Sequence, residues 1–462
     1  MGVSLVGEGL FLSVLLLPPP AGLSFPGWHV LGVSILMASL WMVEAIPFAV
    51  TALLPLVLFP VLGISDFAEA AAPFANPVIF LFLGGFFLAQ AMERCQLHMR
   101  LALWIVRWAG TRESSLVAAL LACSAFLSMW LNNTAVALLM LPIAVSTIRH
   151  FDVGQSASFS AALVLSVAYG SSIGGMATLV GTPSNAIFAG YLLDSHGISI
   201  SFTQWMALAM PVCVILLFFA WIILTKFVFR LHGRVVRGEA LSKGQTDALP
   251  PLSADGWRVL TVLLLAVALW VFRGLLASWL PWLTDAGIAM AAGISLFFVP
   301  SRTSRGGALL NTDTLGKIPF DVLLLIGGGL SLAAAMQSSG LAAWVGSLGA
   351  YAGDLPPSLV LLAVGFAAIC LAELTSNTAT TAAFLPIFGA LATGLGHSPA
   401  TIGGIVTLAS SCGFMLPVST PPNAIVYASG FLTLPQMLRA GLLLNLGALL
   451  LLTLWFGWVY TG

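Results

Sequence analysis

Two distant stretches of this chain carry nearly the same polar motif inside an apolar background. The stretches "LSMWLNNTAVALLMLPI" (127–143) and "LAELTSNTATTAAFLPI" (371–387) align without a gap and share Leu, Asn, Thr, Ala, Leu, Pro and Ile at equivalent places. Downstream, "GTPSNAI" (181–187) matches "STPPNAI" (419–425), and upstream a Gly-Gly pair recurs at 84 and 327. Three blocks in the same order, at offsets of 238 to 244 residues, indicate an internal duplication.

The composition of the chain indicates the environment in which it folds. Of the 462 residues, 60% are hydrophobic and 7% are charged, whereas soluble domains carry about 25% charged residues. Apolar runs of roughly 15–25 residues suit helices that cross a hydrocarbon core about 30 Å thick. We therefore expect an all-α polytopic membrane protein in a lipid bilayer. The formal net charge of zero gives no reason to expect a nucleic-acid partner.

The basic residues predict sidedness. The first copy of the motif is flanked by arginines, whereas no Lys or Arg lies between Lys317 and Arg439 around the second copy. The two copies are therefore expected to enter the membrane from opposite faces, with the basic side and the N-terminus cytoplasmic. The stretch "LFLSVLLLPPP" is expected to be a first short membrane helix and not a cleaved signal. The flanking arginines are Arg94, Arg100, Arg107, Arg112 and Arg149.

The segments on either side of each polar motif are short. Those before the motifs (about 115–130 and 357–374) and after them (about 134–149 and 378–395) have roughly 16 residues each, which at about 1.5 Å per residue is slightly less than a full crossing. They predict two re-entrant helical hairpins with the polar residues at their tips. The "GTP" and "STP" stretches are expected to break the helix that follows each hairpin.

Two such tips could bind an anion. A tip presents free N–H groups and the positive end of a helix dipole, and Asn and Thr side chains add donors. The helix breaks expose carbonyl oxygens that suit a cation such as Na⁺. Alternatively, polar side chains in membrane helices act only as contacts between helices, but duplication with inversion favours a site. The acidic residues Glu44 and Glu373 are expected at depth, where Glu373 would be either a proton carrier or a structural partner.

These motifs, with "EAIP" after a Trp-rich span and "LGG" or "GGG" upstream, resemble the divalent anion:sodium symporter family of dicarboxylate and citrate transporters. The resemblance implies eleven spanning helices plus two hairpins, a homodimer in a bacterial plasma membrane, and an elevator mechanism. It implies scaffold helices in 1–112 and 231–354, and transport domains with one hairpin and one broken helix each in 113–230 and 355–462.

The resemblance also implies site residues, taken position by position. Those expected to contact substrate are Asn132, Asn133, Thr134, Thr182, Ser376, Asn377, Thr378 and Thr420. Those expected to bind sodium are Ser128, Asn133 and Gly181 at one site, and Asn377 and Ser419 at another. Two positions depart from the family pattern: Asn132 replaces a serine, and Ala372 stands where a hydroxyl residue can contribute.

The expected function is therefore sodium-coupled symport of a divalent anion, with a C4-dicarboxylate such as succinate favoured. Sodium would be the coupling ion, and no organic cofactor is expected. The alternatives are a sodium-independent di- or tricarboxylate exchanger, a sulfate-type transporter and, outside transporters, a channel. An enzyme is not expected, because the six histidines form no catalytic or metal-binding motif. Five scattered cysteines indicate neither a disulfide framework nor a metal site.

Overall fold

The computed structural model describes residues 2–108, 110, 112–150, 157–231, 252–302, 307–350 and 355–461. These residues are almost entirely helical. The N-terminal half contains α1 (Gly2–Leu16), α2 (Phe25–Val43), α3 (Phe48–Ala52), α4 (Leu54–Val61), α5 (Phe67–Ala71), η1 (Ala72–Ala75), α6 (Pro77–Arg94), α7 (Leu97–Trp108), α8 (Glu113–Ser128), α9 (Asn133–His150), α10 (Ala157–Met176), α11 (Pro183–His196), α12 (Phe202–Ile222) and η2 (Ile223–Val228). The C-terminal half contains α14 (Ala254–Leu276), α15 (Asp285–Ser295), α16 (Thr312–Leu315), α17 (Phe320–Ser338), α18 (Leu341–Ala350), α19 (Pro357–Leu374), α20 (Asn377–Gly394), α21 (Pro399–Ser410), α22 (Pro421–Ala428) and α23 (Leu434–Thr461).

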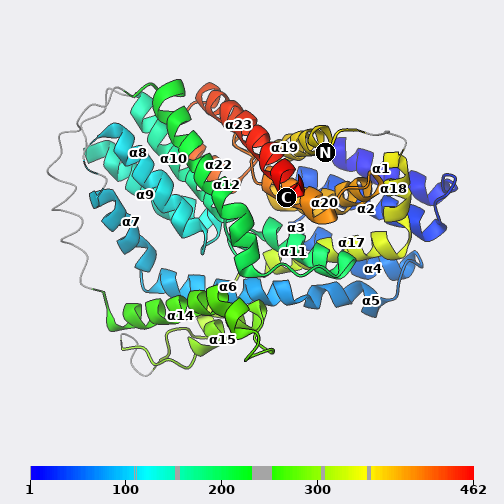
Figure 1. Ribbon diagram of the computed structural model, residues 1–462, viewed down its shortest axis with the longest axis horizontal. Helices are drawn as coiled ribbons and strands as arrows, with labels where there is room; N and C mark the ends of the chain where they lie inside the picture. The colour runs from blue at the N-terminus through cyan, green and yellow to red at the C-terminus, as the bar shows by residue number, and fades with distance from the viewer. Residues whose placement is uncertain are drawn as a thin grey trace.

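The two predicted hairpins are confirmed. Helices α8 and α9 form hairpin 1, and α19 and α20 form hairpin 2, with the polar motifs at the two turns. Hairpin 1 enters the molecule from the left in Figure 1 and hairpin 2 from the right, so the two repeats run in opposite directions. The arms α19 and α20 have 18 residues each, slightly more than the sequence estimate.

The two predicted helix breaks are also present. Residues 177–182 separate α10 from α11, and residues 411–420 separate α21 from α22. Proline begins both second halves, at Pro183 and Pro421, where a missing N–H costs nothing. Each break lies level with the hairpin turn of its own repeat, since α10 packs on α8 and α9 while α21 packs on α19 and α20.

Eleven crossings are counted among the described residues when each broken pair is taken as one crossing and the hairpin arms and connecting helices are left out: α1, α2, α3 with α4, α6, α10 with α11, α12, α14, α15, α17, α21 with α22, and α23. By length and hydropathy alone, eight helices among the described residues qualify as membrane spans. One of these eight is α19, which turns back as a hairpin arm. The difference arises because the broken and short crossings fall below the length of a continuous span.

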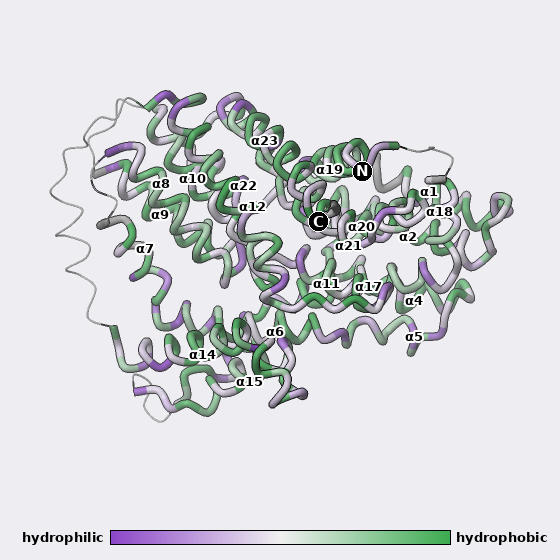
Figure 2. The backbone as a smooth tube through the Cα atoms, viewed as in Figure 1, coloured by the Kyte–Doolittle hydropathy of each residue, from purple (hydrophilic) through white to green (hydrophobic). Residues whose placement is uncertain are grey.

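Burial divides the helices into central and peripheral ones. Every residue of α10 from Phe159 to Met176 is buried, whereas α14 exposes large apolar side chains such as Leu275, which is 73% exposed. Figure 2 shows hydrophobic residues along most of the helices, and many large apolar side chains among them are exposed. An apolar exterior of this kind suits lipid contact, and the buried α10 places its break and the adjoining hairpin turn inside the protein.

The duplicated Gly-Gly pair has a packing reason. A Cβ atom at Gly84 would lie 2.4 Å from the backbone of Ala289 in α15, and one at Gly328 would lie 2.3 Å from the carbonyl oxygen of Ala52 in α3. Both distances are too short for any side chain. The glycines therefore allow α6 and α17 to approach their neighbours at backbone contact.

Candidate functional site

A cavity of about 210 Å³ lies where the two hairpin turns and the two helix breaks meet. All eight residues predicted to contact substrate line it. They are Asn132, Asn133, Thr134, Thr182, Ser376, Asn377, Thr378 and Thr420. Residues separated by more than 200 positions in the sequence therefore converge on one space.

Six helices begin at this cavity among the described residues, four of them in the duplicated elements and the others α17 and the short α3. Its lining includes the first residues of α9 and α20 at the hairpin turns, and of α11 and α22 after the breaks. The sequence analysis counted the positive N-termini of the helices that begin at the two hairpin turns. It did not count those of the helices that begin after the two breaks. Each helix N-terminus acts like roughly half a positive charge, so the four together supply about two.

The cavity lining contains an acidic side chain that the sequence analysis did not identify. Asp321, at the start of α17, is exposed and lines the cavity together with Val322 and Leu325 of the same helix and Phe48 of α3. No Lys or Arg is among the described residues that line it. In the sequence, α17 is marked only by its glycines. Nothing in the sequence indicates that its first turn lies near the duplicated motifs.

The first predicted cation site is a compact group of oxygen atoms. Ser128 Oγ lies 2.6 Å from the amide oxygen of Asn133. The same end of that amide faces the carbonyl oxygens of Ser171 and Gly181, each at 3.3 Å, and a hydrogen-bonded arrangement with them requires the amide to be turned. With the amide turned, its nitrogen donates to Ser128 Oγ at 2.6 Å and to the two carbonyl oxygens, so three oxygen atoms converge on the Asn133 side chain. Ser128, Asn133 and Gly181 therefore meet as predicted, and Ser171 joins them as a carbonyl that the sequence analysis missed.

The second predicted cation site is less complete. The Ser419 hydroxyl donates to the carbonyl oxygens of Gly413, at 3.0 Å, and Leu416, at 2.8 Å. Asn377 does not point toward this group, because its Oδ1 accepts the N–H of Thr378 at 2.8 Å. Ala372, the match of Ser128, is fully buried and contributes its carbonyl oxygen beside Gly413. The donor set therefore fits a cation better in repeat 1 than in repeat 2.

Glu373 has a structural role. Its carboxylate is buried and accepts the backbone N–H groups of Phe414, Met415 and Leu416 at 2.8–3.0 Å, together with the Asn445 amide at 2.6 Å. It thereby satisfies three donors that the break after α21 leaves without helical partners. The structural reading of Glu373 is supported over proton transfer, because these contacts tie its side chain to the break and to α23.

The expectation that Glu44 lies at depth in the membrane stays a prediction. Its side chain is exposed, and its backbone closes α2 in a left-handed conformation with φ 49°. The following Pro47 begins α3, so the "EAIP" motif is a junction between two helices.

The fold and cavity define a class: membrane transporters with inverted repeats, in which paired hairpins and broken helices surround a site inside the bundle. The family described as sodium:sulfate symporter transmembrane region matches residues 6–461. The chain belongs to this family.

Two bacterial relatives match nearly the whole chain. The chain is 36% identical to the sodium-dependent dicarboxylate transporter SdcS of Staphylococcus saprophyticus, over 97% of this chain and 89% of that one. It is 36% identical to SdcS of Staphylococcus aureus, over 96% of this chain and 88% of that one.

Solved structures confirm the fold at greater distance. The YdaH transporter of Alcanivorax borkumensis superposes with a TM-score of 0.60 at 15% identity, covering 94% of this chain and 99% of that one. MtrF of Neisseria gonorrhoeae superposes with a TM-score of 0.58 at 13% identity, covering 96% and 97%. At such identities the likeness concerns the fold alone.

Proposed function

We propose that this protein is a sodium-coupled symporter of divalent anions, with a C4-dicarboxylate such as succinate as substrate. The observation that carries the proposal is the cavity, which brings both duplicated motifs together. The names of the SdcS relatives agree in substrate class and in sodium dependence. A bacterial plasma membrane, with the basic helix ends and the N-terminus on the cytoplasmic side, is part of the proposal.

Charge balance supports coupling to a cation. The four helix N-termini supply about two positive charges, which would offset a dianion alone. Asp321 in the lining and Glu373 behind the second break add two carboxylates. An excess of negative charge in a medium of low dielectric costs several kcal/mol or more. Sodium at the Ser128–Asn133–Gly181 group would reduce this excess, because a bound cation adds a full charge within the same region.

An elevator mechanism, with the scaffold and transport domains of the sequence analysis, is the second part of the proposal. The two hairpins are matched in sequence but differ in their surroundings. Helix α20 of hairpin 2 packs against α2, α17 and α18, which belong to the scaffold ranges. Helix α9 of hairpin 1 has its main contacts with α8, α10 and α22, all in the transport ranges, and hairpin 1 meets the scaffold range mainly through α8 against α7. In an elevator mechanism, the transport domain slides past the scaffold, and in each end state one hairpin packs against the scaffold. Here hairpin 2 does so, which would close the site on the side of hairpin 2. A homodimer held by the scaffold completes this part.

A sodium-independent exchanger is the second candidate, and the incomplete second cation site favours it. Ala372 lacks the hydroxyl of Ser128, and Asn377 does not face Ser419. Uptake of labelled succinate, citrate and sulfate into proteoliposomes separates the candidates. Symport predicts uptake of succinate driven by a sodium gradient without an internal anion. An exchanger would need an internal counter-substrate and no sodium, and a preference for sulfate would change the substrate assignment.

A further inference from the structure

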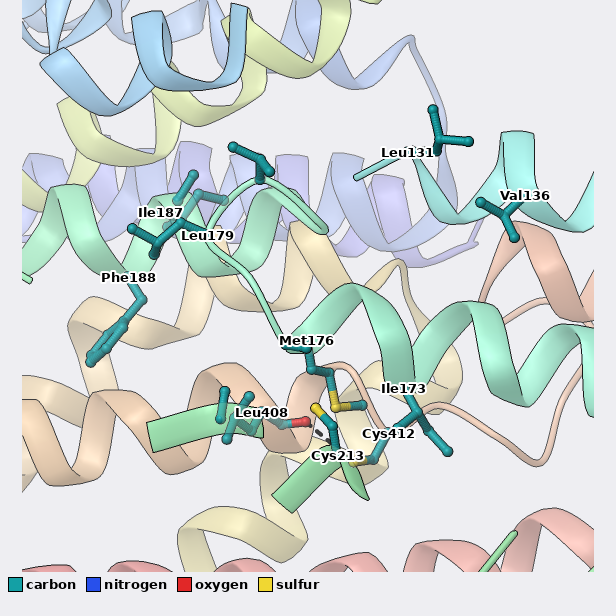
Figure 3. Close-up of a cluster of buried hydrophobic side chains, with 14 of the residues drawn as sticks. Leu131, Val136, Ile173, Met176, Leu179, Ile187, Phe188, Cys213, Leu408 and Cys412 are labelled. Atoms are coloured by element: carbon teal, nitrogen blue, oxygen red, sulfur yellow. Dashed lines mark hydrogen bonds between the residues drawn. The ribbon is translucent and has the colours of Figure 1, made fainter. Parts of the chain in front are cut away.

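Both helix breaks lie in a densely packed, apolar part of the protein. Figure 3 shows Met176 at the first break near Cys213 of α12 and Cys412 at the second break, with Leu179 farther along the first break. All four residues are buried. Gly175, Met176, Thr178 and Gly413 are buried at the breaks, so the carbonyl oxygens released there need donors from protein side chains.

One asparagine supplies those donors at each break. In repeat 1, the Nδ2 of Asn185 lies 3.1 Å from the carbonyl oxygen of Gly175, 3.2 Å from that of Met176 and 2.7 Å from that of Thr178. In repeat 2, the Nδ2 of Asn423 lies 2.9 Å from Gly413 O, 3.0 Å from Leu416 O and 3.0 Å from Ser419 Oγ. Each amide sits on the helix after the break. In repeat 1 it bonds the end of α10 and the break, and in repeat 2 it bonds the break alone.

The two asparagines are equivalent by the duplication. Asn185 and Asn423 are 238 residues apart, and so are their shared acceptors Gly175 and Gly413. Both side chains are fully buried, and the Oδ1 of each has no hydrogen-bond partner within the described structure. An unpaired buried polar atom costs about 1–3 kcal/mol, which a residue such as Ala would avoid. Both repeats nevertheless have an asparagine here, which indicates that its amide N–H groups are needed at the break.

The acceptor glycines connect each amide to the cation ligands. A Cβ atom on Gly175 would lie 2.3 Å from Asn133 Oδ1, and one on Gly181 would lie 2.4 Å from the Gly175 carbonyl oxygen. On the other side, a Cβ on Gly413 would lie 3.0 Å from Ser419 Cβ and 3.3 Å from the Ala372 carbonyl oxygen. Movement of either glycine would therefore displace oxygen atoms of the cation site beside it.

From this geometry we infer that Asn185 and Asn423 are positioning residues for the two cation sites: each amide fixes its helix break, and with it the spacing of the oxygen ligands. The inference rests on the proposed function, because it concerns the sodium sites of that transporter. Groups that orient metal ligands typically change metal affinity by about 10- to 100-fold when removed.

The test measures sodium binding directly and through transport. Asn185→Ala and Asn423→Ala are expected to raise, by about tenfold or more, the sodium concentration for half-maximal succinate uptake. They should also reduce the upward shift in Tm that sodium produces in the full-length protein without substrate, since stabilisation by a ligand falls as its Kd rises. Asn185→Ser and Asn423→Ser, which keep one donor, are expected to lie between Ala and wild type.

The control is Ser184→Ala, which removes a fully buried hydroxyl next to Asn185 that bonds no break carbonyl. It should leave sodium dependence unchanged. Sodium half-saturation and Tm shifts equal to wild type in the alanine variants would overturn the inference. Should those variants not fold, wild-type sodium dependence in both serine variants would overturn it equally. If wild type itself shows no response to sodium over choline, the proposed function fails, and this inference with it.

Discussion

At the scale of single residues, the matched asparagines of the two hairpin turns make different contacts. Asn133 joins the oxygen atoms of Ser128, Ser171 and Gly181, whereas Asn377 Oδ1 accepts the N–H of Thr378. Both are half-buried and line the cavity. For the proposed function we therefore assign Asn133 to the cation and Asn377 to the substrate, although the sequence predicts both roles for both residues.

Asn377→Ala should lower succinate uptake by about ten- to hundredfold, because a hydrogen bond to a charged ligand contributes about 1.5–3 kcal/mol. The measurement is initial uptake into proteoliposomes, with size-exclusion chromatography and Tm to confirm folding. Thr407→Ala is the matched control, since the buried Thr407 hydroxyl bonds only within α21, to Gly403 O at 2.7 Å. Uptake near the wild-type rate in the Asn377 variant would remove this residue from the site.

Ala372→Ser should lower the sodium concentration needed for half-maximal uptake. It restores at the second site the hydroxyl that Ser128 provides at the first, and serine adds a single heavy atom to a fully buried position. The sodium dependence of uptake measures the effect, and Ala368→Ser, one helical turn earlier in α19 and equally buried, controls for the added hydroxyl. Equal half-saturation in wild type and Ala372→Ser would show that the second site gains nothing from this oxygen.

At the scale of elements, the two helix breaks are stabilised by different means. Asn185 and Asn423 act in both repeats, but only the second break also has a carboxylate, Glu373, which accepts three backbone N–H groups. The matching position in repeat 1 is Met129. The second break, from 411 to 420, is longer than the first and leaves more backbone groups to satisfy.

Glu373→Ala should destabilise the protein strongly. It leaves three backbone donors and the Asn445 amide without their acceptor, and each buried unsatisfied group costs about 1–3 kcal/mol. Thermal unfolding in detergent should show a Tm several degrees below that of wild type. Glu44→Ala, which removes an exposed carboxylate, is expected to change stability by less than about 0.5 kcal/mol. Similar Tm values for the two variants would contradict the role assigned to Glu373.

The inverted orientation of the hairpins predicts opposite labelling. Arg149→Cys at the end of α9 and His397→Cys beyond the end of α20, each in a background without the five native cysteines, should react with a membrane-impermeant thiol reagent from opposite sides of the membrane. The cytoplasmic side is expected for the first. Reaction of both from one side would refute the inverted repeat in the membrane.

Much of this architecture could be predicted from the sequence because it is duplicated. Two copies of the motif, at a nearly constant offset and with unequal flanking charge, gave the hairpins, the breaks and the cavity residues. Asp321 and Phe48 could not be found in this way, since they belong to helices outside the motifs and reach the cavity only through tertiary packing. Ser171 contributes a backbone carbonyl, which any residue type would provide, so its identity carries no signal.

At the scale of the whole molecule, the account depends on charge. About two positive charges from four helix ends face a dianion and the carboxylates Asp321 and Glu373, with no basic side chain among the described residues that line the cavity. Asp321→Asn should therefore weaken the dependence on sodium, because it removes one negative charge that a cation would otherwise balance. Sodium titrations of succinate uptake measure the change, and an unaltered sodium requirement would exclude Asp321 from the balance.

Sodium coupling itself is tested most directly by succinate uptake with purified protein in proteoliposomes that contain no internal anion substrate. A sodium gradient directed inward should drive accumulation of labelled succinate, and replacement of sodium by choline should abolish it. Equal uptake in the two buffers, or uptake only when an internal dicarboxylate is supplied, would contradict symport and identify the protein as an exchanger.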